Sequence, residues 1–327
     1  SYGDGEDKPC LMPGEDRILP YFNVATDVLR NKSYNNAITF YNQQYWEVRD
    51  LELYDPNYEE NRPEAEMWEG GVYRRAINLM AEDAGDLYGF TIDNCTIHGF
   101  RGLNSNRGKS SGGIIITILS DPDDSTKRVP TGIHDITVTN CEMYNLGRSG
   151  FNFSSPWTTR RNENSHGDDW GSFDYGGYGD WYPCKNIYIA NNIIHDIDGD
   201  GILIDGCENV LVEHNTVYRC LKFTRMAVGM FNWNSDYTVF QYNEVYDTCP
   251  SDKDPKGNTY DGQGIEIDAL NRDTLVQYNY SHNNRGGSLM WCNINSERGF
   301  RGIYRYNIFE NEGNIWGVVD WRPNHYD

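Results

Sequence analysis

Phe240-Gln-Tyr-Asn243-Glu-Val245 is one of four copies of a short phrase in the second half of this chain. In each copy an apolar residue is followed three places later by Asn, and another apolar residue stands two places after the Asn. The other copies, together with a fifth that ends in Ser, are Ile189-Ala-Asn-Asn192-Ile-Ile194, Val212-Glu-His-Asn215-Thr-Val217, Tyr304-Arg-Tyr-Asn307-Ile-Phe309 and Val276-Gln-Tyr-Asn279-Tyr-Ser281. The successive spacings from Asn192 to Asn307 are 23, 28, 36 and 28 residues. Repeats near this period indicate stacked units that bury their apolar edges against their neighbours.

Each unit consists of short β-rich runs separated by Gly, Asn and Asp, without helical periodicity. This pattern predicts strands rather than helices. The expected fold is therefore all-β, one right-handed parallel β-helix with long loop insertions over residues 1–327. An Asn at the same turn of each coil can hydrogen-bond along the stack and satisfy buried backbone groups. We therefore expect a stacked, inward-facing column of Asn192, Asn215, Asn243, Asn279 and Asn307.

Earlier in the chain the same phrase carries other residues in the Asn position, namely Leu51, Cys95 and Cys141. The spacings from Leu51 to Asn192 are 44, 46 and 51 residues, which predicts one coil plus an insertion of about 20 residues in each case. We expect the two Cys residues to be small buried members of the column. The opening Ser1-Tyr-Gly-Asp-Gly-Glu begins as if within a turn, so we expect a piece of a longer protein.

The composition limits the class of partner. Lys and Arg total 28 against 49 Asp and Glu, a formal net charge of -21, which argues against nucleic acid because its binding needs basic surface. The surplus of aromatic residues, with 24 Tyr and 9 Trp, suits flat hydroxyl-rich ligands such as carbohydrates. No apolar run approaches the roughly 18 residues that a membrane span needs. These features predict a carbohydrate partner, no nucleic acid, no membrane span, and a secreted or cell-surface location.

A column of acids and aromatics is predicted on the outer surface of four coils. The strands that precede the Asn phrases contain Gly201-Ile-Leu-Ile-Asp205, Gly229-Met-Phe-Asn-Trp233, Gly264-Ile-Glu-Ile-Asp268 and Gly287-Ser-Leu-Met-Trp291. Alternation places Ile202, Ile204, Ile265 and Ile267 inside. The expected outward column is then Asp205, Trp233, Asp268 and Trp291, with Glu266 on the same face.

Acids interleaved with aromatics are what a sugar-cleaving cleft requires, since aromatic rings stack on pyranose faces while paired carboxyls perform acid–base chemistry. The most specific local motif is Asp-Gly-x-Gly-Ile-x-Ile-Asp, which occurs at 198–205 and at 261–268. It places Asp261 directly before the strand that ends at Asp268. The insertion 155–183 is rich in aromatic residues, and we expect it to wall the cleft. The expected sugar contacts are Trp233, Trp291, Trp170, Trp181, Arg285 and His282.

At these residues the chain resembles a known group. The repeats over residues 46–310 are similar to the right-handed parallel β-helix of carbohydrate-active enzymes. The run Asp261-Gly-Gln-Gly-Ile-Glu-Ile-Asp268, followed by Gln277-Tyr-Asn-Tyr-Ser-His282 and Arg285-Gly-Gly, resembles bacterial β-helix glycosidases of the lacto-N-biosidase type. The resemblance implies a glycoside hydrolase whose catalytic pair is Asp261 and Asp268. From the outward column we expect Asp205 and Glu266 to support them. No cofactor is expected.

Alternative functions and a metal site remain open from the sequence. A polysaccharide lyase would share the fold but needs a basic residue to abstract a proton, for which Lys222 and Arg225 come first, then His282 and Arg285. A non-catalytic carbohydrate-binding solenoid would leave the acids solvated. A calcium site could be formed by Asp196, Asp198 and Asp200, because Ca²⁺ prefers oxygen ligands.

Overall fold

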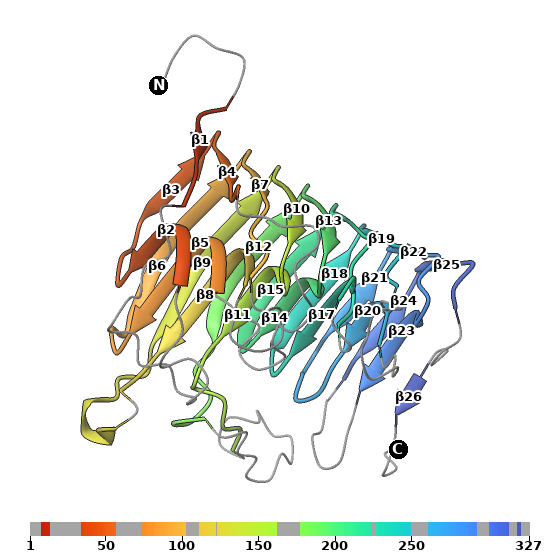
Figure 1. Cartoon of the computed structure of the whole chain (residues 1–327). Helices are drawn as coiled ribbons and strands as arrows, with labels where there is room; N and C mark the ends of the chain where they lie inside the picture. The colour runs from red at the N-terminus through yellow and green to blue at the C-terminus, as the bar shows by residue number, and fades with distance from the viewer. Residues whose placement is uncertain are drawn as a thin grey trace.

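A computed structural model describes residues 8–13, 34–56, 73–102, 111–121, 123–161, 177–223, 227–249, 261–292, 301–313 and 319–321. These residues form three parallel sheets, here called A, B and C, with nine, nine and eight strands. One short 3-10 helix, Ser125–Lys127, is the helical element among them. Neighbouring strands of each sheet come from successive coils, so the stack runs in chain order from the red N-terminal end to the blue C-terminal end (Figure 1). The predicted parallel β-helix is confirmed.

Within each coil the chain passes through a strand of sheet B, then one of sheet C, then one of sheet A. Sheet A contains β1 (Cys10–Leu11), β4 (Glu52–Tyr54), β7 (Thr96–His98), β10 (Glu142–Leu146), β13 (Ile193–Ile197), β16 (Thr216–Tyr218), β19 (Glu244–Tyr246), β22 (Tyr280–His282) and β25 (Ile308–Glu310). Sheet B contains β2 (Tyr34–Tyr41), β5 (Tyr73–Glu82), β8 (Gly112–Leu119), β11 (Ser149–Ser154), β14 (Asp200–Asp205), β17 (Met230–Trp233), β20 (Gln263–Ile267), β23 (Gly287–Cys292) and β26 (Val319–Trp321). Sheet C contains β3 (Trp46–Arg49), β6 (Asp86–Asp93), β9 (Gly132–Thr139), β12 (Cys184–Ala190), β15 (Cys207–Glu213), β18 (Asp236–Gln241), β21 (Leu275–Gln277) and β24 (Ile303–Arg305).

The corner from sheet C to sheet A has the same construction in every coil. Each of these connections is two residues long: Asp50-Leu51, Asn94-Cys95, Asn140-Cys141, Asn191-Asn192, His214-Asn215, Tyr242-Asn243, Tyr278-Asn279 and Tyr306-Asn307. The first residue of each pair has a left-handed backbone, with φ between 51° and 58°. A single left-handed residue bends the chain sharply within a short corner. The second residue of the pair belongs to the column that the sequence predicts.

The Asn column forms a continuous hydrogen-bonded ladder. From Asn192 to Asn279, each Asn donates both its backbone N–H and its side-chain amide to the Oδ1 of the next Asn, at 2.9–3.0 Å. The ladder continues upstream, where the N–H of Cys141 donates to Asn192 at 2.9 Å and the N–H of Cys95 donates to the sulfur of Cys141 at 3.5 Å. Both thiols are buried, as predicted. The ladder satisfies backbone groups that the corner would otherwise leave unpaired.

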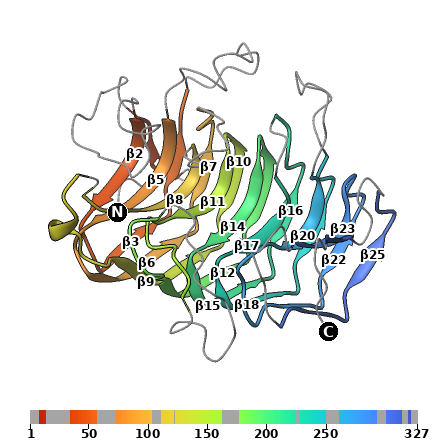
Figure 2. The ribbon, with the colours of Figure 1, turned by 90° about the horizontal axis from the view of Figure 1, so that it is seen from below.

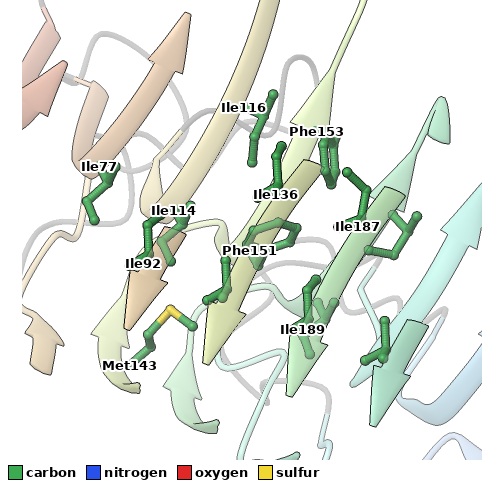
Figure 3. Close-up of a cluster of buried hydrophobic side chains, with 14 of the residues drawn as sticks. Ile77, Ile92, Ile114, Ile116, Ile136, Met143, Phe151, Phe153, Ile187 and Ile189 are labelled. Atoms are coloured by element: carbon green, nitrogen blue, oxygen red, sulfur yellow. The ribbon is translucent and has the colours of Figure 1, made fainter. Parts of the chain in front are cut away.

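The interior is a column of aliphatic and aromatic side chains contributed by all three sheets (Figure 3). In sheet B, Ile77, Ile114, Phe151 and Ile202 are successive register partners, and each is fully buried. Burying one such side chain contributes about 1.5–3 kcal/mol. Since each coil buries its apolar face against the coils on either side, the stack is stabilised as a whole rather than coil by coil.

Sheet B differs from the other two sheets in its burial. Strands of sheets A and C alternate between buried and partly exposed residues, as β15 and β16 do. In contrast, every residue of β8 is buried, and so are all but the last residue of β11 and of β14. The outer face of sheet B is therefore shielded from solvent, whereas the outer faces of A and C are not. Figure 2 shows the sheet B strands side by side in the second view. Among the described residues no helix is long and apolar enough to cross a membrane.

Candidate active site

The two predicted catalytic acids flank strand β20 of sheet B. Asp261 precedes the strand by two residues, and Asp268 follows it directly. Ile265 and Ile267 lie in the core, which confirms the predicted alternation. Glu266, between them, is the register partner of Phe231 on one side and Met290 on the other, and it is only 4% exposed. The strand therefore presents a shielded carboxyl outward between two partly exposed ones.

The predicted outward column is correct over three coils. Asp205 pairs with Trp233, and Asn232 pairs with Ile267, so Trp233 stands between Asp205 and Asp268. The ring of Trp233 packs against two apolar groups on this side of the molecule. These groups are Leu203, Val228 and Phe231, and Ala269 and Leu270. An apolar platform thus lies beside the carboxyl of Asp268.

The fourth member of the column was predicted wrongly. Trp291 pairs with Ile267 rather than Asp268, and it packs against the core. The reason is the position of the glycines. Gly287 pairs with Gln263, so Ser288, not Gly287, is aligned with Gly264. Because side chains alternate along a strand, a shift of one residue exchanges the two faces. Cys292 therefore takes the outward place opposite Asp268.

Cys292 is the point on which the acids converge. Its sulfur and the carboxylate oxygens of Glu266 and Asp268 all lie within 4.8 Å of one another. The pKa of the Cys292 thiol is strongly raised, first by burial and then by the negative charges of Asp268 and Glu266, by a hydrogen bond with Asp268, and by the charge of Asp261. Asp261, Glu266 and Asp268 thus act on one buried group. Glu266 and Asp268 come together on the outer face of sheet B, whereas Asp205 lies two coils away.

Asp268 is held by several backbone hydrogen bonds. Its N–H donates to the carbonyl of Asn232 at 3.1 Å, and its carboxylate accepts the N–H of Ala269 at 2.7 Å. The side-chain amide of Asn271 donates to the carbonyl oxygens of both Asn232 and Asp268. This arrangement fixes the residue where the strand ends and the turn begins, which restricts the directions its carboxyl can take.

Tyr304 reaches the same place from within the stack. It lies on β24 of sheet C, packs against the core, and donates its hydroxyl to the carbonyl of Met290 at 2.7 Å. The same hydroxyl accepts the N–H of Ile267 at 3.1 Å. Burial, together with the nearby charge of Glu266, raises the pKa of Tyr304 well above its usual value. A neutral phenol therefore bridges β20 and β23 directly beneath the acids.

The remaining predicted contacts are distributed over different parts of the molecule. Arg285 is exposed and lies in the turn before β23, where its N–H donates to Thr248 at 2.9 Å. Trp181 is 8% exposed, with Arg160 3.5 Å from its ring centroid and its indole N–H donating to Asn234. The described ends of the 155–183 insertion thus pack at the corner between sheets B and C. Trp170 lies outside the described residues.

The assignment of His282 to the cleft is wrong. His282 lies on β22 of sheet A, where it pairs with Glu244 at 3.2 Å and stacks on Tyr246 with ring centroids 4.7 Å apart. It is one member of a row of stacked rings on that sheet, formed by Tyr54, His98, Tyr144, His195, Tyr218, Tyr246 and His282. His282 is close to Arg285 in sequence, but the turn at Asn284 separates the two sheets.

The predicted calcium ligands are each paired with a cation. Asp196 accepts hydrogen bonds from Arg219 and Lys222, while Asp198 pairs with Arg101 at 2.5 Å and Asp200 with Arg148 at 2.6 Å. Each of these three carboxylates therefore has its own basic partner in the structure. Among the described residues, the group with ligand atoms close enough for a metal is Glu266, Asp268 and Cys292. Its thiol is a soft ligand that calcium does not favour.

Cys292 and Tyr304 are the residues near the acids that the sequence did not identify. Cys292 could have been found from the sequence, since it stands one coil after Asp268. The prediction missed it because it aligned Gly287, rather than Ser288, with Gly264. For Tyr304 there was no such signal, because its hydroxyl crosses the interior from another sheet.

Comparisons with known proteins agree with this architecture. Residues 180–324 match the family model described as the right-handed β-helix region. A lacto-N-biosidase of Bifidobacterium longum subsp. longum is 27% identical over 274 residues, which cover 77% of this chain and 16% of that protein. The crystal structure of native GH136 lacto-N-biosidase from Eubacterium ramulus has a TM-score of 0.71 at 22% identity, covering 94% of this chain and 48% of that chain. Its selenomethionine derivative has the same TM-score at 21% identity.

This chain therefore spans 16% of the curated relative and about half of the solved one. The predicted handedness agrees with the matched family model. The chain is a right-handed parallel β-helix that is similar in sequence and in fold to lacto-N-biosidases.

Proposed function

We propose that this chain carries the catalytic site of a glycoside hydrolase that acts on an oligosaccharide. The observation that carries the proposal is the convergence of Glu266 and Asp268 on the buried thiol of Cys292 at the outer face of sheet B, with the charge of Asp261 also acting on that thiol. The similarity of this chain to lacto-N-biosidases supports the proposal.

In the proposed mechanism, Asp261 and Asp268 divide the two tasks of glycoside hydrolysis. One carboxyl protonates the oxygen of the leaving sugar, and the other acts on the opposite side as base or nucleophile. Asp268 suits this work because its backbone and carboxylate are fixed by Asn232, Asn271 and Ala269. Glu266 contributes a shielded negative charge next to Asp268, which favours the positive charge that develops on the sugar ring.

We place the saccharide over the Trp233 platform, between Asp205 and Asp268. The partly exposed ring of Trp233, which is supported from behind by buried apolar side chains, suits the flat face of a pyranose, and the flanking carboxyls suit its hydroxyl groups. Arg285 lies in the turn that contacts the Asp261 segment, at the other end of β20, and is placed to contact a sugar unit there. A secreted or cell-surface location forms part of this proposal, since it brings the enzyme to glycans outside the cell.

No observation favours the lyase alternative. Lys222 is 3.1 Å from Asp196 and is engaged there, Arg225 lies outside the described residues, and His282 is on sheet A. The two alternatives differ from a hydrolase in their products, so one experiment separates all three. A lyase would create an unsaturated sugar that absorbs ultraviolet light, and a binding protein would leave the glycan intact.

The test is to incubate the purified chain with a panel of neutral and uronate-containing oligosaccharides and measure both released reducing ends and ultraviolet absorbance. The proposal expects new reducing ends without a chromophore, and no release by the Asp268→Asn variant. An ultraviolet-absorbing product, or retention of glycans without cleavage, would overturn it in favour of a lyase or a binding solenoid respectively.

A further inference from the structure

We infer that Cys292 is a positioning residue, whose neutral thiol orients the carboxylate of Asp268 by a hydrogen bond from the neighbouring coil. This inference rests on the proposed function, because it assigns Cys292 a part in the chemistry of that site. Its basis is the register of one pair of strands, the character of the thiol, and its contrast with the other cysteines of the chain.

The register sets Cys292 opposite Asp268. Glu266 pairs with Met290 and Ile267 pairs with Trp291, so the next positions along the two strands are Asp268 and Cys292. Adjacent parallel strands stand about 4.8 Å apart, which brings side chains on the same face into contact. The sulfur of Cys292 accordingly lies within 4.8 Å of the carboxylate oxygens of both Glu266 and Asp268. The thiol therefore occupies the space next to two like-charged groups.

The thiol acts there as a donor. Burial and the charges of Asp268, Glu266 and Asp261 disfavour the thiolate, so Cys292 keeps its proton throughout the neutral range. A protonated thiol is not a strong nucleophile, but it can donate one hydrogen bond to a carboxylate. Such a donor offsets the repulsion between the carboxylates of Glu266 and Asp268 and gives the carboxylate of Asp268 a fixed partner on the neighbouring coil.

The other buried cysteines have a different environment. Five thiols lie within the apolar interior, and the core packing accounts for them. They are Cys95, Cys141, Cys184, Cys207 and Cys220. Cys292 is 5% exposed but does not belong to that interior cluster of the described residues. Its sulfur lies beside two acids, which is an unfavourable place for a residue that serves only as a small apolar filler.

The experiment compares Cys292→Ala, which removes the donor, with Cys292→Ser, which retains one. Cys10→Ala is the control, because Cys10 is an exposed thiol on the first coil. For Cys292→Ala we expect kcat to fall about ten- to a hundredfold with KM nearly unchanged, because the interaction acts on the reacting carboxyl rather than on substrate binding. Cys292→Ser should recover most of the lost rate, and the control should match the wild type.

The pH profile distinguishes positioning from a general structural role. A donor to a carboxylate favours its charged form, so removing the donor raises the pKa of Asp268. One limb of the kcat/KM profile of Cys292→Ala should therefore move to higher pH. A shift of the acidic limb would make Asp268 the base or nucleophile, and a shift of the alkaline limb would make it the acid. An unshifted profile, with kcat lost only in proportion to a lower melting temperature, would overturn the inference.

The failure of this inference differs from the failure of the proposed function. If the wild-type chain cleaves a glycan and Cys292→Ala cleaves it equally well, the role of Cys292 is refuted while the hydrolase proposal stands. If the wild-type chain cleaves none of the oligosaccharides tested, both the proposed function and the role of Cys292 are refuted.

Discussion

Gly286 lies against the backbone of Asp261. A Cβ atom at position 286 would stand 2.6 Å from the carbonyl oxygen of Asp261 and 2.3 Å from the carbonyl carbon of Gly262. The N–H of Gly286 also donates to the carbonyl of Gly262 at 2.9 Å. The turn that carries Arg285 is thus pressed onto the segment that carries one of the proposed catalytic acids. This contact requires glycine because backbone atoms cannot move aside as a flexible side chain can.

Gly286→Ala should therefore displace Asp261 and lower kcat about tenfold or more, because small misplacements of reacting groups have large effects on rate. The free energy of unfolding should also fall by about 1–3 kcal/mol, because Gly286 is buried and the added Cβ meets backbone atoms. Gly85→Ala is the control: its φ of 71° strains any side chain, but no atom lies within 4 Å of the added Cβ. Steady-state kinetics and thermal melting measure both. Equal activity of Gly286→Ala and wild type would contradict the expected displacement.

Replacing either proposed catalytic acid should abolish most turnover. Asp261→Asn and Asp268→Asn keep the size of the side chain but remove its acid–base function, so each should reduce kcat by about 10²–10⁴-fold. The fold should persist, as judged by circular dichroism. Asp135→Asn, on the outer face of sheet C, provides the matched control. Near-normal activity of both active-site variants on a cleaved substrate would show that the assignment is wrong.

Tyr304→Phe should weaken the join between β20 and β23. The variant removes the hydroxyl that links Ile267 to Met290 and leaves both backbone groups without that partner. We expect a loss of about 1–3 kcal/mol in the free energy of unfolding, and a lower kcat because Asp268 directly follows Ile267. Chemical denaturation and kinetics test this together. Tyr306→Phe, an exposed tyrosine on the same coil, should change neither quantity; a similar effect of both variants would count against the bridge.

Asn243→Ala should interrupt the ladder in its middle. The variant removes the oxygen that accepts two hydrogen bonds from Asn215 and the amide that donates to Asn279. The free energy of unfolding should fall by about 1–3 kcal/mol, because the groups left behind are buried. Urea denaturation measures the change, with the exposed residue Gln44 replaced by Ala as control. An unchanged unfolding midpoint would be incompatible with a buried, fully bonded column.

Asp196 should make the stability depend on pH in the acid range. Burial alone would raise its pKa, but hydrogen bonds from His195, Arg219 and Lys222 outweigh burial and lower the pKa far below its usual value. A lowered folded-state pKa contributes stability above the unfolded value of about 3.9, and the contribution is lost as the pH falls. The Asp196→Asn variant should therefore lose less stability than wild type between about pH 5 and pH 2. Parallel slopes for the two proteins would refute this contribution.

Much of the fold could be predicted from the sequence because the repeat fixes equivalent positions. Asn192 to Asn307 are equivalent since each follows a left-handed residue at a corner of constant length. Likewise, Ile265 and Ile267 are buried because strand alternation leaves one face to the core. In both cases neighbouring residues in the chain determine the result. The location of Asp261 and Asp268 on one outer surface follows from the same local rules.

Predictions that depended on the alignment of distant segments were less secure. Arg285-Gly286-Gly287-Ser288 offers two glycines near the place where Gly264 has its partner, and the partner is in fact Ser288. Because of this one-residue difference from the prediction, Trp291 faces the core and Cys292 lies beside Asp268. The assignment of His282 was wrong for a related reason, since only two residues stand between it and Arg285 although a corner lies there. Packing between coils decided both positions.

The unvarying corner between sheets C and A has a consequence for how such a molecule can diversify. The connections that vary in length are those at the two ends of the sheet B strands. The connection from sheet B to sheet C, for example, ranges from Gly206 alone to residues 155–183. Doubling a loop costs only about 0.6 kcal/mol in closure entropy, whereas one residue inserted at the fixed corner would disturb a whole column. The connections around the acids are thus the part of the molecule that tolerates insertions. New substrate specificities could arise there while the corner between sheets C and A stays the same.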